Sequence, residues 1–338
     1  MRISGKGLIN REKLVNFKFD GSDYKGFEGD TVASALLASG KKLFGRSFKY
    51  HRPRGVLTAG SEEPNALLTV GQGAFQDPNI RATTQEIFEG LITKSQNNWP
   101  NLHYDILSAN DLFSDFLGAG FYYKTFMWPK SFWEKVYEPF IRRAAGLGAL
   151  SGLHNSDTYE KAYTFCDLLI IGGGPSGLMA AKIAAEAGLD VIIVEQEPIF
   201  GGRLISETEE VDGVLGSVWA AKTVKNLEEL NNVRLFSRTT VTGAYDQGNF
   251  AAVERVGHHL PKRGGDRPLE CFWRIVAKHS ILAAGAIERS IAFPNNDRPG
   301  IMSAGAVRTY LNRFGVSTGK SVALFCNCLL YTSDAADE

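Results

Sequence analysis

The sequence predicts an α/β plus α+β protein built from two unlike domains, and two patterns predict it. Residues 167–195 are expected to form a strand, a glycine-rich turn, a helix and a second strand, the unit of a Rossmann-like FAD/NAD(P)-binding domain. Residues 14–40 are expected to form strand, turn, strand and helix, the opening of a ferredoxin-like β-grasp domain. A chain of 338 residues with 44% apolar side chains is long enough for about two separate cores.

The first domain is expected over residues 1–110. Leu14–Phe19 alternates polar and apolar side chains, which favours a strand, and Asp20-Gly21 is a turn signal that returns it as a hairpin. Asp30 is expected to cap a helix that ends at Gly40. In plant-type ferredoxins the next loop carries cysteine thiolates, but no cysteine precedes Cys166 here. We therefore expect a domain without a 2Fe-2S cluster, and stoichiometric iron and sulfide would contradict this expectation.

The loop after this helix is rich in basic and aromatic side chains. The preferred interpretation is a solvated or partner-facing loop, and binding of a phosphate or carboxylate from a cofactor or substrate is the main alternative. Nucleic-acid binding is the least favoured, because the 37 basic residues of the chain balance its 37 acidic ones. The basic residues of the loop are Lys41, Lys42, Arg46, Lys49, Arg52 and Arg54.

Residues 111–160 are expected to form an aromatic connecting segment and a linker. Aromatic residues are dense between Phe113 and Phe140, and charged residues interrupt them, which excludes a membrane span. Burial against the chain's own domains is the preferred interpretation, and a subunit interface is the alternative. The glycine- and serine-rich stretch Gly146–Asn155 is expected to be the linker.

Targeting signals are absent from the sequence as given. Its start lacks the apolar core of a signal peptide, and no run approaches the ~18 apolar residues of a membrane span. Cysteines are few and scattered, which fits a reducing compartment. The sequence therefore predicts a cytoplasmic protein with neither nucleic acid nor a membrane as partner.

The second domain is expected over residues 161–327 and begins with the apolar strand Leu168–Ile171. Three glycines follow with separate roles. Gly172 permits the tight turn, Gly174 lets the backbone approach a pyrophosphate, and Gly177 lets the helix pack closely on the strand.

The helix is expected to begin at Pro175 and Ser176, with its N-terminal amides aimed at the phosphates, and to stop at Gly188. Val191–Val194 is expected to be the second strand. Glu195 ends it, about twenty residues after the glycines, where a carboxylate accepts the hydroxyls of an adenosine ribose.

The residues after this strand complete the expected site. Gln196 stands where an arginine would accommodate a 2′-phosphate, which favours FAD or NAD over NADP. Gly202 and Arg203 follow, and Arg203 could still reach a phosphate. After a small β-excursion, Ala284 and Gly285 are expected to bring the backbone back to the cofactor. The expected strands of this region are Val233–Val241, Phe250–Val256, Phe272–Leu282, which leads into a buried strand from Ile281 to the turn at Gly285, and Gly319–Phe325.

Residues 328–338 read as the translation of a sequencing adapter, and we exclude them from the fold prediction. On this interpretation the natural chain is longer and the sequence is an N-terminal fragment. An acidic native C-terminus is the alternative.

From about Phe17 to Phe325 the chain resembles the alpha subunit of heterotetrameric sarcosine oxidase. Four blocks carry the resemblance: Gly29–Leu37, Gly45–Gly55 with Glu63–Asn65, Gly120–Pro129, and Ala283–Arg289 with Asn296–Gly300.

The resemblance implies oxidation of sarcosine to glycine, with tetrahydrofolate as the acceptor of the methyl carbon and oxygen as the electron acceptor. It implies NAD in this chain, FMN at the interface with the beta subunit, FAD and tetrahydrofolate elsewhere in the complete complex, and gamma and delta subunits as further partners. Gly172, Gly174, Gly177 and Glu195 match the NAD-site pattern of the family. The folate residues would lie in a part that this sequence lacks.

Two alternatives stay open. The large subunit of N-methylglutamate dehydrogenase shares this architecture, and a non-catalytic dinucleotide-binding protein would retain the nucleotide as a structural ligand. The six histidines have no metal-like spacing, so no metal site is expected and no catalytic residue is assigned. We expect the redox chemistry to take place in a partner subunit.

Overall fold

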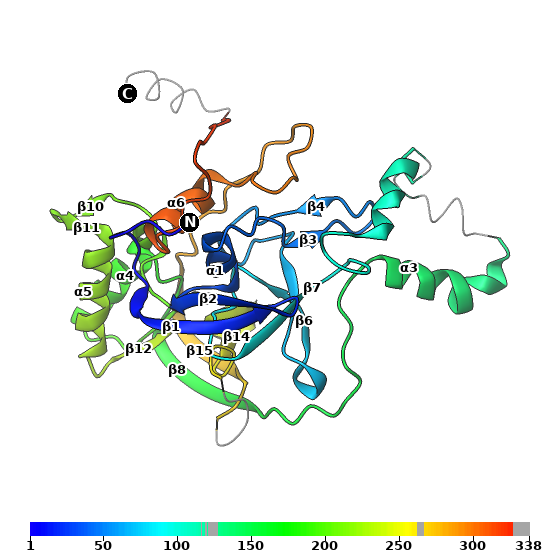
Figure 1. The fold of residues 1–338 in the computed structure, drawn as a ribbon. Coiled ribbons are helices and arrows are strands. Elements are labelled where there is room, and N and C mark those ends of the chain that lie inside the picture. The colour runs from blue at the N-terminus through cyan, green and yellow to red at the C-terminus, as the bar shows by residue number, and fades with distance from the viewer. Residues whose placement is uncertain (116, 119, 121–127, 262–266, 327–338) are drawn as a thin grey trace.

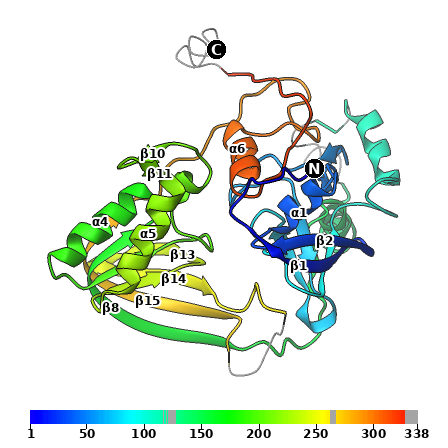
Figure 2. The same cartoon turned by 60° about the vertical axis from the view of Figure 1, so that its left-hand side comes forward.

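The computed structural model describes the chain except residues 116, 119, 121–127, 262–266 and 327–338. It contains two sheet-based units, the first blue to cyan and the second green to yellow in Figure 1. Figure 2 shows the two sheets side by side, with helix α6 (Ala304–Asn312) next to the first unit. The expected adapter translation lies outside the described residues.

The first unit is a β-grasp sheet in the order β2-β1-β7-β5-β6, and the predicted fold class is confirmed here. Strand β1 forms an antiparallel hairpin with β2 and lies parallel to β7, while α1 packs over the sheet. Its elements are β1 (Asn10–Phe19), β2 (Ser22–Glu28), α1 (Val32–Ala38), β5 (Leu67–Val70), η1 (Gly73–Phe75), β6 (Asp77–Arg81) and β7 (Leu91–Ser95), with a short hairpin of β3 (Gly45–Arg46) and β4 (Pro53–Arg54).

The hairpin turn forms as the sequence predicts, but the helix cap differs. Asp20 and Gly21 have φ angles of 49° and 78°, the left-handed pair that joins twisted antiparallel strands. The N-cap of α1 is Thr31, whose Oγ1 accepts from the Ser34 amide at 3.2 Å. Asp30 is fully buried one residue earlier and forms an ion pair with Arg2, so its expected capping role is wrong.

The second unit is a six-stranded sheet in the order β12-β9-β8-β15-β14-β13. The first four strands are parallel to one another, while β14 pairs antiparallel with β15 and β13 pairs antiparallel with β14. This is expected for a Rossmann-like unit with a β-excursion. Helices α4 and α5 cover the same face (Figure 2). The elements are β8 (Tyr159–Ile171), α4 (Pro175–Glu186), β9 (Val191–Val194), η5 (Gly202–Ile205), β10 (Glu210–Val211), β11 (Val214–Leu215), α5 (Gly216–Glu228), β12 (Val233–Phe236), β13 (Thr239–Tyr245), η6 (Asp246–Gly248), β14 (Asn249–Arg255) and β15 (Glu270–Leu282).

Strand predictions in the second unit need three corrections. The single strand expected at residues 233–241 is two strands, because Arg238 has a φ of 51° and breaks the extended backbone between β12 and β13. The end of β15 is not buried: Leu282 is 77% exposed, since β14 pairs with β15 only as far as Val276. Residues 319–325 form no strand, and Phe325 is 63% exposed.

Helix α6 belongs to the first core although it follows the second sheet in the chain. Ala306, Tyr310, Phe314 and Val316 are buried in the same apolar cluster as Phe17. The range 161–327 that we expected to form the second domain therefore includes a segment that packs in the first unit.

The connecting segment projects from the first unit, as Figure 1 shows for α3. It comprises η2 (Ile106–Phe113), η3 (Lys130–Phe132), η4 (Trp133–Tyr137) and α3 (Glu138–Ala144). Among its described aromatic side chains, Phe113, Trp128, Phe132 and Phe140 are exposed, with Trp128 at 83% and Phe140 at 66%, whereas Trp133 and Tyr137 are half-buried. Five of the expected aromatics, Phe116, Phe121, Tyr122, Tyr123 and Phe126, lie outside the described residues. Among the described residues no helix has the length and apolar character needed to cross a bilayer.

Candidate functional site

The glycine-rich turn joins β8 to α4 in a tight backbone crossing. Gly172 has a φ of 111°, and a Cβ there would overlap with the carbonyl oxygen of Ala283. A Cβ on Gly177 would overlap with the carbonyl oxygen of Gly172. Both positions therefore require glycine for close packing, which agrees with the roles that the sequence predicts for them.

Gly174 lies beside open space at the start of α4. It is the N-cap, Pro175 is in the first turn, and the only nearby atom for a Cβ on Gly174 is the Gly202 Cα at 3.9 Å. Gly202 has a φ of 53°, and a Cβ on it would come to 2.9 Å from the Gly174 Cα. Pro175 and Ser176 are exposed, so the helix N-terminus with its free amides is open to a ligand.

The carboxylate of Glu195 lies against the glycine-rich turn. Its Oε2 accepts from the Gly173 amide at 2.8 Å and its Oε1 from the Glu197 amide at 2.9 Å. Glu195 is 8% exposed, and burial raises the pKa of its carboxyl above the ordinary 4.5, against the opposing effect of the two amides. The carboxylate thus connects the glycine-rich turn to the turn after β9. The sequence predicts that the adenosine ribose binds beside this carboxylate.

The other predicted residues surround this turn to different degrees. The loop with Ala284 and Gly285 is exposed and directly follows the Ala283 carbonyl that meets Gly172. Arg203 is directed to Glu207, with Nε 2.8 Å from Oε1, so the structure gives it a carboxylate partner rather than an empty phosphate site. Gln196 extends toward the first unit, where its Oε1 accepts from Ser61 Oγ at 3.2 Å.

Sequence reasoning missed the side chains that hold Gln196 and Glu197 in place. Arg255 Nη2 donates to the Gln196 carbonyl oxygen at 2.8 Å, and Arg313 Nη1 lies 2.9 Å from Glu197 Oε2. These partners are 59 and 116 residues away in the chain, and no local motif marks them.

The first unit offers no ligand set for a 2Fe-2S cluster. It has no cysteine, and in the described part of the chain no three His, Cys, Asp or Glu side chains are grouped to hold a metal. The loop over residues 44–55 is instead closed by Arg46, which donates to the Leu102 carbonyl oxygen at 2.8 Å, and by a buried contact of 2.7 Å between His51 Nδ1 and Asp105 Oδ2. The residues present do not fit the cluster.

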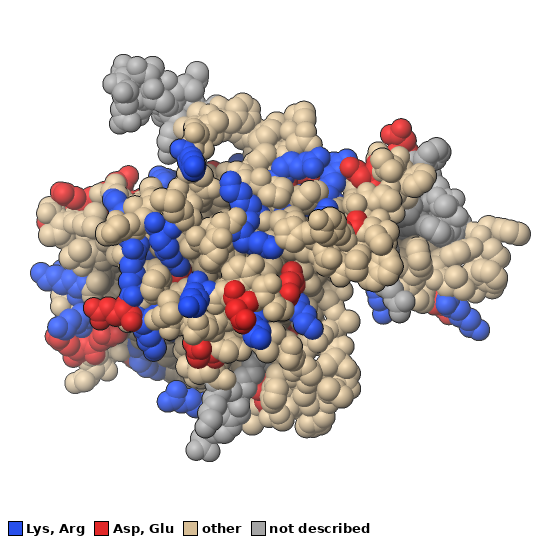
Figure 3. Space-filling model, in the orientation of Figure 1, with Lys and Arg blue, Asp and Glu red and all other residues tan. Residues whose placement is uncertain are grey.

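Two of the six basic side chains of the loop pair with carboxylates. Arg52 Nε lies 2.8 Å from Asp111 Oδ1, and Arg54 forms an ion pair with Asp297. On the face drawn in Figure 3, basic and acidic side chains are mixed over the two units, and both kinds also occur on the projecting segment.

Comparison with known proteins agrees with these two units. Residues 12–98 match the family model described as 2Fe-2S iron-sulfur cluster binding domain, and residues 167–255 match the one described as FAD dependent oxidoreductase. Sarcosine oxidase subunit alpha of Rhizobium meliloti (strain 1021) is 54% identical over 96% of this chain and 33% of its own length. The chain is homologous to sarcosine oxidase alpha subunits.

A second sarcosine oxidase subunit alpha, from Corynebacterium sp. (strain U-96), is 35% identical over 94% of this chain and 28% of its own length. The chain thus spans about a third of the length of these curated sarcosine oxidase relatives. The crystal structure of L-proline dehydrogenase from P. horikoshii aligns with 94% of this chain and 50% of its own, with a TM-score of 0.59 at 21% identity. At that identity the likeness shows a shared fold.

Proposed function

We propose that this chain forms the N-terminal part of the alpha subunit of a heterotetrameric sarcosine oxidase. The complete enzyme would oxidise sarcosine to glycine, with tetrahydrofolate accepting the methyl carbon and oxygen accepting the electrons. The observation that carries the proposal is the 54% identity to a sarcosine oxidase alpha subunit along nearly the whole chain.

Within that enzyme, we propose that residues 172–203 bind NAD. The open N-terminus of α4 suits a pyrophosphate, and Glu195 lies where an adenosine ribose would be accepted. Gln196 follows it in place of a basic residue, which supports NAD over NADP. The family model for residues 167–255 refers to FAD, so FAD is the competing occupant of the same cradle.

The proposed role of this chain is supportive rather than catalytic. Around the glycine-rich turn the described titratable side chains are already engaged: Glu195 with backbone amides and Arg203 with Glu207. We therefore assign sarcosine oxidation to FAD in the beta subunit, electron transfer to FMN at the beta interface, and folate chemistry to the rest of the complex, with gamma and delta as the further subunits and the cytoplasm as its location.

The projecting segment is the surface that we propose for docking the beta subunit. Its short helices η2, η3 and η4 contain no buried residue, and helices of this length are unstable without packing against another surface. Large aromatic side chains exposed close together, such as Trp128, Phe132 and Phe140, are typical of a protein interface, where aromatic residues are enriched. The names of the relatives, subunit alpha, support a partner chain as the occupant.

The test uses the full-length chain assembled with its beta, gamma and delta partners. We expect sarcosine to drive oxygen consumption and peroxide release, and the denatured complex to release NAD in a one-to-one ratio to the alpha chain. Turnover of N-methylglutamate with no turnover of sarcosine would instead identify the chain as part of the large subunit of N-methylglutamate dehydrogenase. A complex that oxidises neither amine would support the binding-only alternative.

A further inference from the structure

The turn that carries Glu195 is held from the side of the first unit. Ser61, which contacts the Gln196 side chain, belongs to the first unit. Arg313, which pairs with Glu197, directly follows α6, and α6 packs in the first core. The side chain of Arg313 is only 6% exposed, so this pair is held within the protein rather than on its surface.

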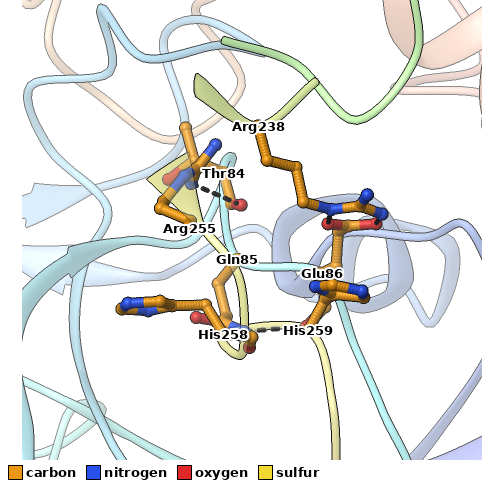
Figure 4. Close-up of a pocket in the computed structure, with 7 residues that line it drawn as sticks. All are labelled: Thr84, Gln85, Glu86, Arg238, Arg255, His258 and His259. Carbon is orange, nitrogen blue, oxygen red and sulfur yellow. Dashed lines mark hydrogen bonds and ion pairs between the residues drawn. The ribbon is translucent and has the colours of Figure 1, made fainter. Parts of the chain in front are cut away.

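Arg255 contacts both units with a single guanidinium group. At the end of β14, its Nη2 donates to the Gln196 carbonyl oxygen at 2.8 Å, and its Nη1 lies 3.5 Å from the Thr84 carbonyl oxygen (Figure 4). Next to Thr84, the carbonyl oxygen of Gln85 accepts from the Val32 amide at 2.9 Å, at the start of α1. One planar group therefore connects the turn beside the dinucleotide cradle to the core helix of the first unit.

A second connection runs alongside it. Arg238 donates through Nε and Nη2 to the two carboxylate oxygens of Glu86, at 2.6 and 2.8 Å, and the Arg238 amide donates to the Glu197 carbonyl oxygen at 3.1 Å. Gln85 Nε2 donates to the His258 carbonyl oxygen at 2.9 Å. These contacts surround a small polar pocket between the units, lined by Thr84, Gln85, Glu86, Arg238, Arg255, His258 and His259 (Figure 4).

We propose that the first unit preorganises the adenosine end of the dinucleotide site at residues 172–203, with Arg255 as a positioning residue. We also propose that dinucleotide binding in turn stabilises the contacts between the two units. The inference rests on the proposed dinucleotide binding. Glu195 can present its carboxylate to a ribose only while residues 195–197 keep their place, and a turn fixed before binding spares the ligand the entropic cost of ordering it. Coupling of two equilibria is reciprocal, so the ligand must also stabilise the contacts that favour its binding.

The test compares Arg255→Met with Arg274→Met in the full-length chain within its native assembly. Arg274, on the neighbouring strand β15, donates to Asn249 Oδ1 at 3.1 Å within the second unit. It therefore controls for the loss of an arginine. We expect Arg255→Met to weaken the binding of both NAD⁺ and ADP-ribose by about tenfold in calorimetric titration, because both ligands contain the adenosine half and the variant loses the charged hydrogen bond that holds the Gln196 turn in place. Arg255→Lys should recover only part of the affinity, since one ammonium cannot reproduce the planar fork.

Hydrogen exchange supplies a readout that a purely structural role would leave unchanged. In the wild-type chain, NAD⁺ should slow amide exchange in residues 82–87, far from the glycine-rich turn in sequence, and this slowing should vanish in Arg255→Met while the melting temperature stays within a few degrees. Equal affinities of Arg255→Met and wild type, or no slowing in residues 82–87, would overturn the inference alone. A loss confined to NAD⁺ would overturn the assignment to the adenosine end, and a wild-type chain that binds neither NAD⁺ nor FAD would overturn the proposed function as well.

Discussion

Two glycines of the same turn meet different physical demands. Gly177 has no room for a methyl group because the carbonyl oxygen of Gly172 occupies that space. Gly174 has room within the protein, and the methyl group would project into the space that we assign to a pyrophosphate. Stability and binding can therefore be separated at neighbouring positions.

We expect Gly177→Ala to lower the free energy of unfolding by about 2–3 kcal/mol, because the methyl group must displace backbone atoms. Gly174→Ala is expected to leave the unfolding free energy within about 0.5 kcal/mol of wild type and to abolish measurable NAD⁺ binding. Urea unfolding and calorimetric titration of both variants check this pair. Retention of NAD⁺ affinity in Gly174→Ala would place the pyrophosphate elsewhere.

The raised pKa of Glu195 makes a prediction about pH. A carboxyl whose folded pKa lies above its unfolded value of 4.5 contributes stability when protonated, and that contribution is lost as pH rises through the folded pKa. The ligand-free wild type should therefore gain stability relative to Glu195→Gln as pH falls from 7 toward 4.5. Thermal melts of both proteins across this range test the sign, and parallel curves would contradict it.

The roles of the glycines can be predicted from sequence because each depends on neighbours within the same strand, turn and helix. The contribution of Arg255 cannot, because its acceptor Thr84 is 171 residues away and only the folded chain brings them together. Arg203 is predicted from its place after Gly202 to reach a phosphate, and the folded chain adds a neighbour one helical turn later, Glu207, which its Nε contacts at 2.8 Å.

At the scale of elements, α6 contributes a large, fully buried side chain to the first core. Tyr310 is completely buried, and its hydroxyl donates to the Thr58 carbonyl oxygen at 3.0 Å. The helix thus contributes both apolar packing and a buried hydrogen bond to a unit whose other elements end more than 200 residues earlier in the chain.

We expect Tyr310→Ala to lower the unfolding free energy by about 3–5 kcal/mol, because it removes a large buried side chain. Tyr310→Phe should cost about 1–2 kcal/mol, because it keeps the ring and leaves the Thr58 carbonyl unpaired. Tyr245→Phe, at a side chain that is 65% exposed, serves as the control and should change stability little. Equal stability of Tyr310→Phe and wild type would show that the hydrogen bond has no net effect.

Elements were predictable where pattern and pairing agree. Residues 191–194 are apolar throughout and lie between two parallel partners, so β9 has the predicted bounds. Residues 319–325 end in four apolar side chains but have no neighbouring strand among the described residues, and pattern alone does not create a strand without a partner. At residues 233–241 the β-branched pattern concealed the left-handed Arg238, a conformation that single side chains rarely signal.

At the scale of the whole molecule, the described part of the projecting segment exposes several large apolar side chains. Phe140 on α3 and Ile183 on α4 are similarly exposed, at 66% and 61%, which makes them a matched pair. Phe140→Glu should weaken assembly with the beta subunit at least tenfold, because a charge would be buried in an apolar interface, whereas Ile183→Glu should leave assembly unchanged. Analytical ultracentrifugation of the mixed subunits measures both. Equal assembly of the two variants would exclude the segment as the docking surface.

The return of α6 to the first core has a consequence for biosynthesis. A ribosome releases the β-grasp strands early, but the side chains of Tyr310, Phe314 and Val316 that complete their core emerge only after the whole second sheet has been translated. The core of the first unit therefore remains incomplete while the dinucleotide unit, an insertion between its two parts, is synthesised and folds. Proteolytic cleavage in the linker at residues 146–155 would accordingly nick the protein without releasing two self-sufficient halves, because the segment that closes the first core would remain attached to the second.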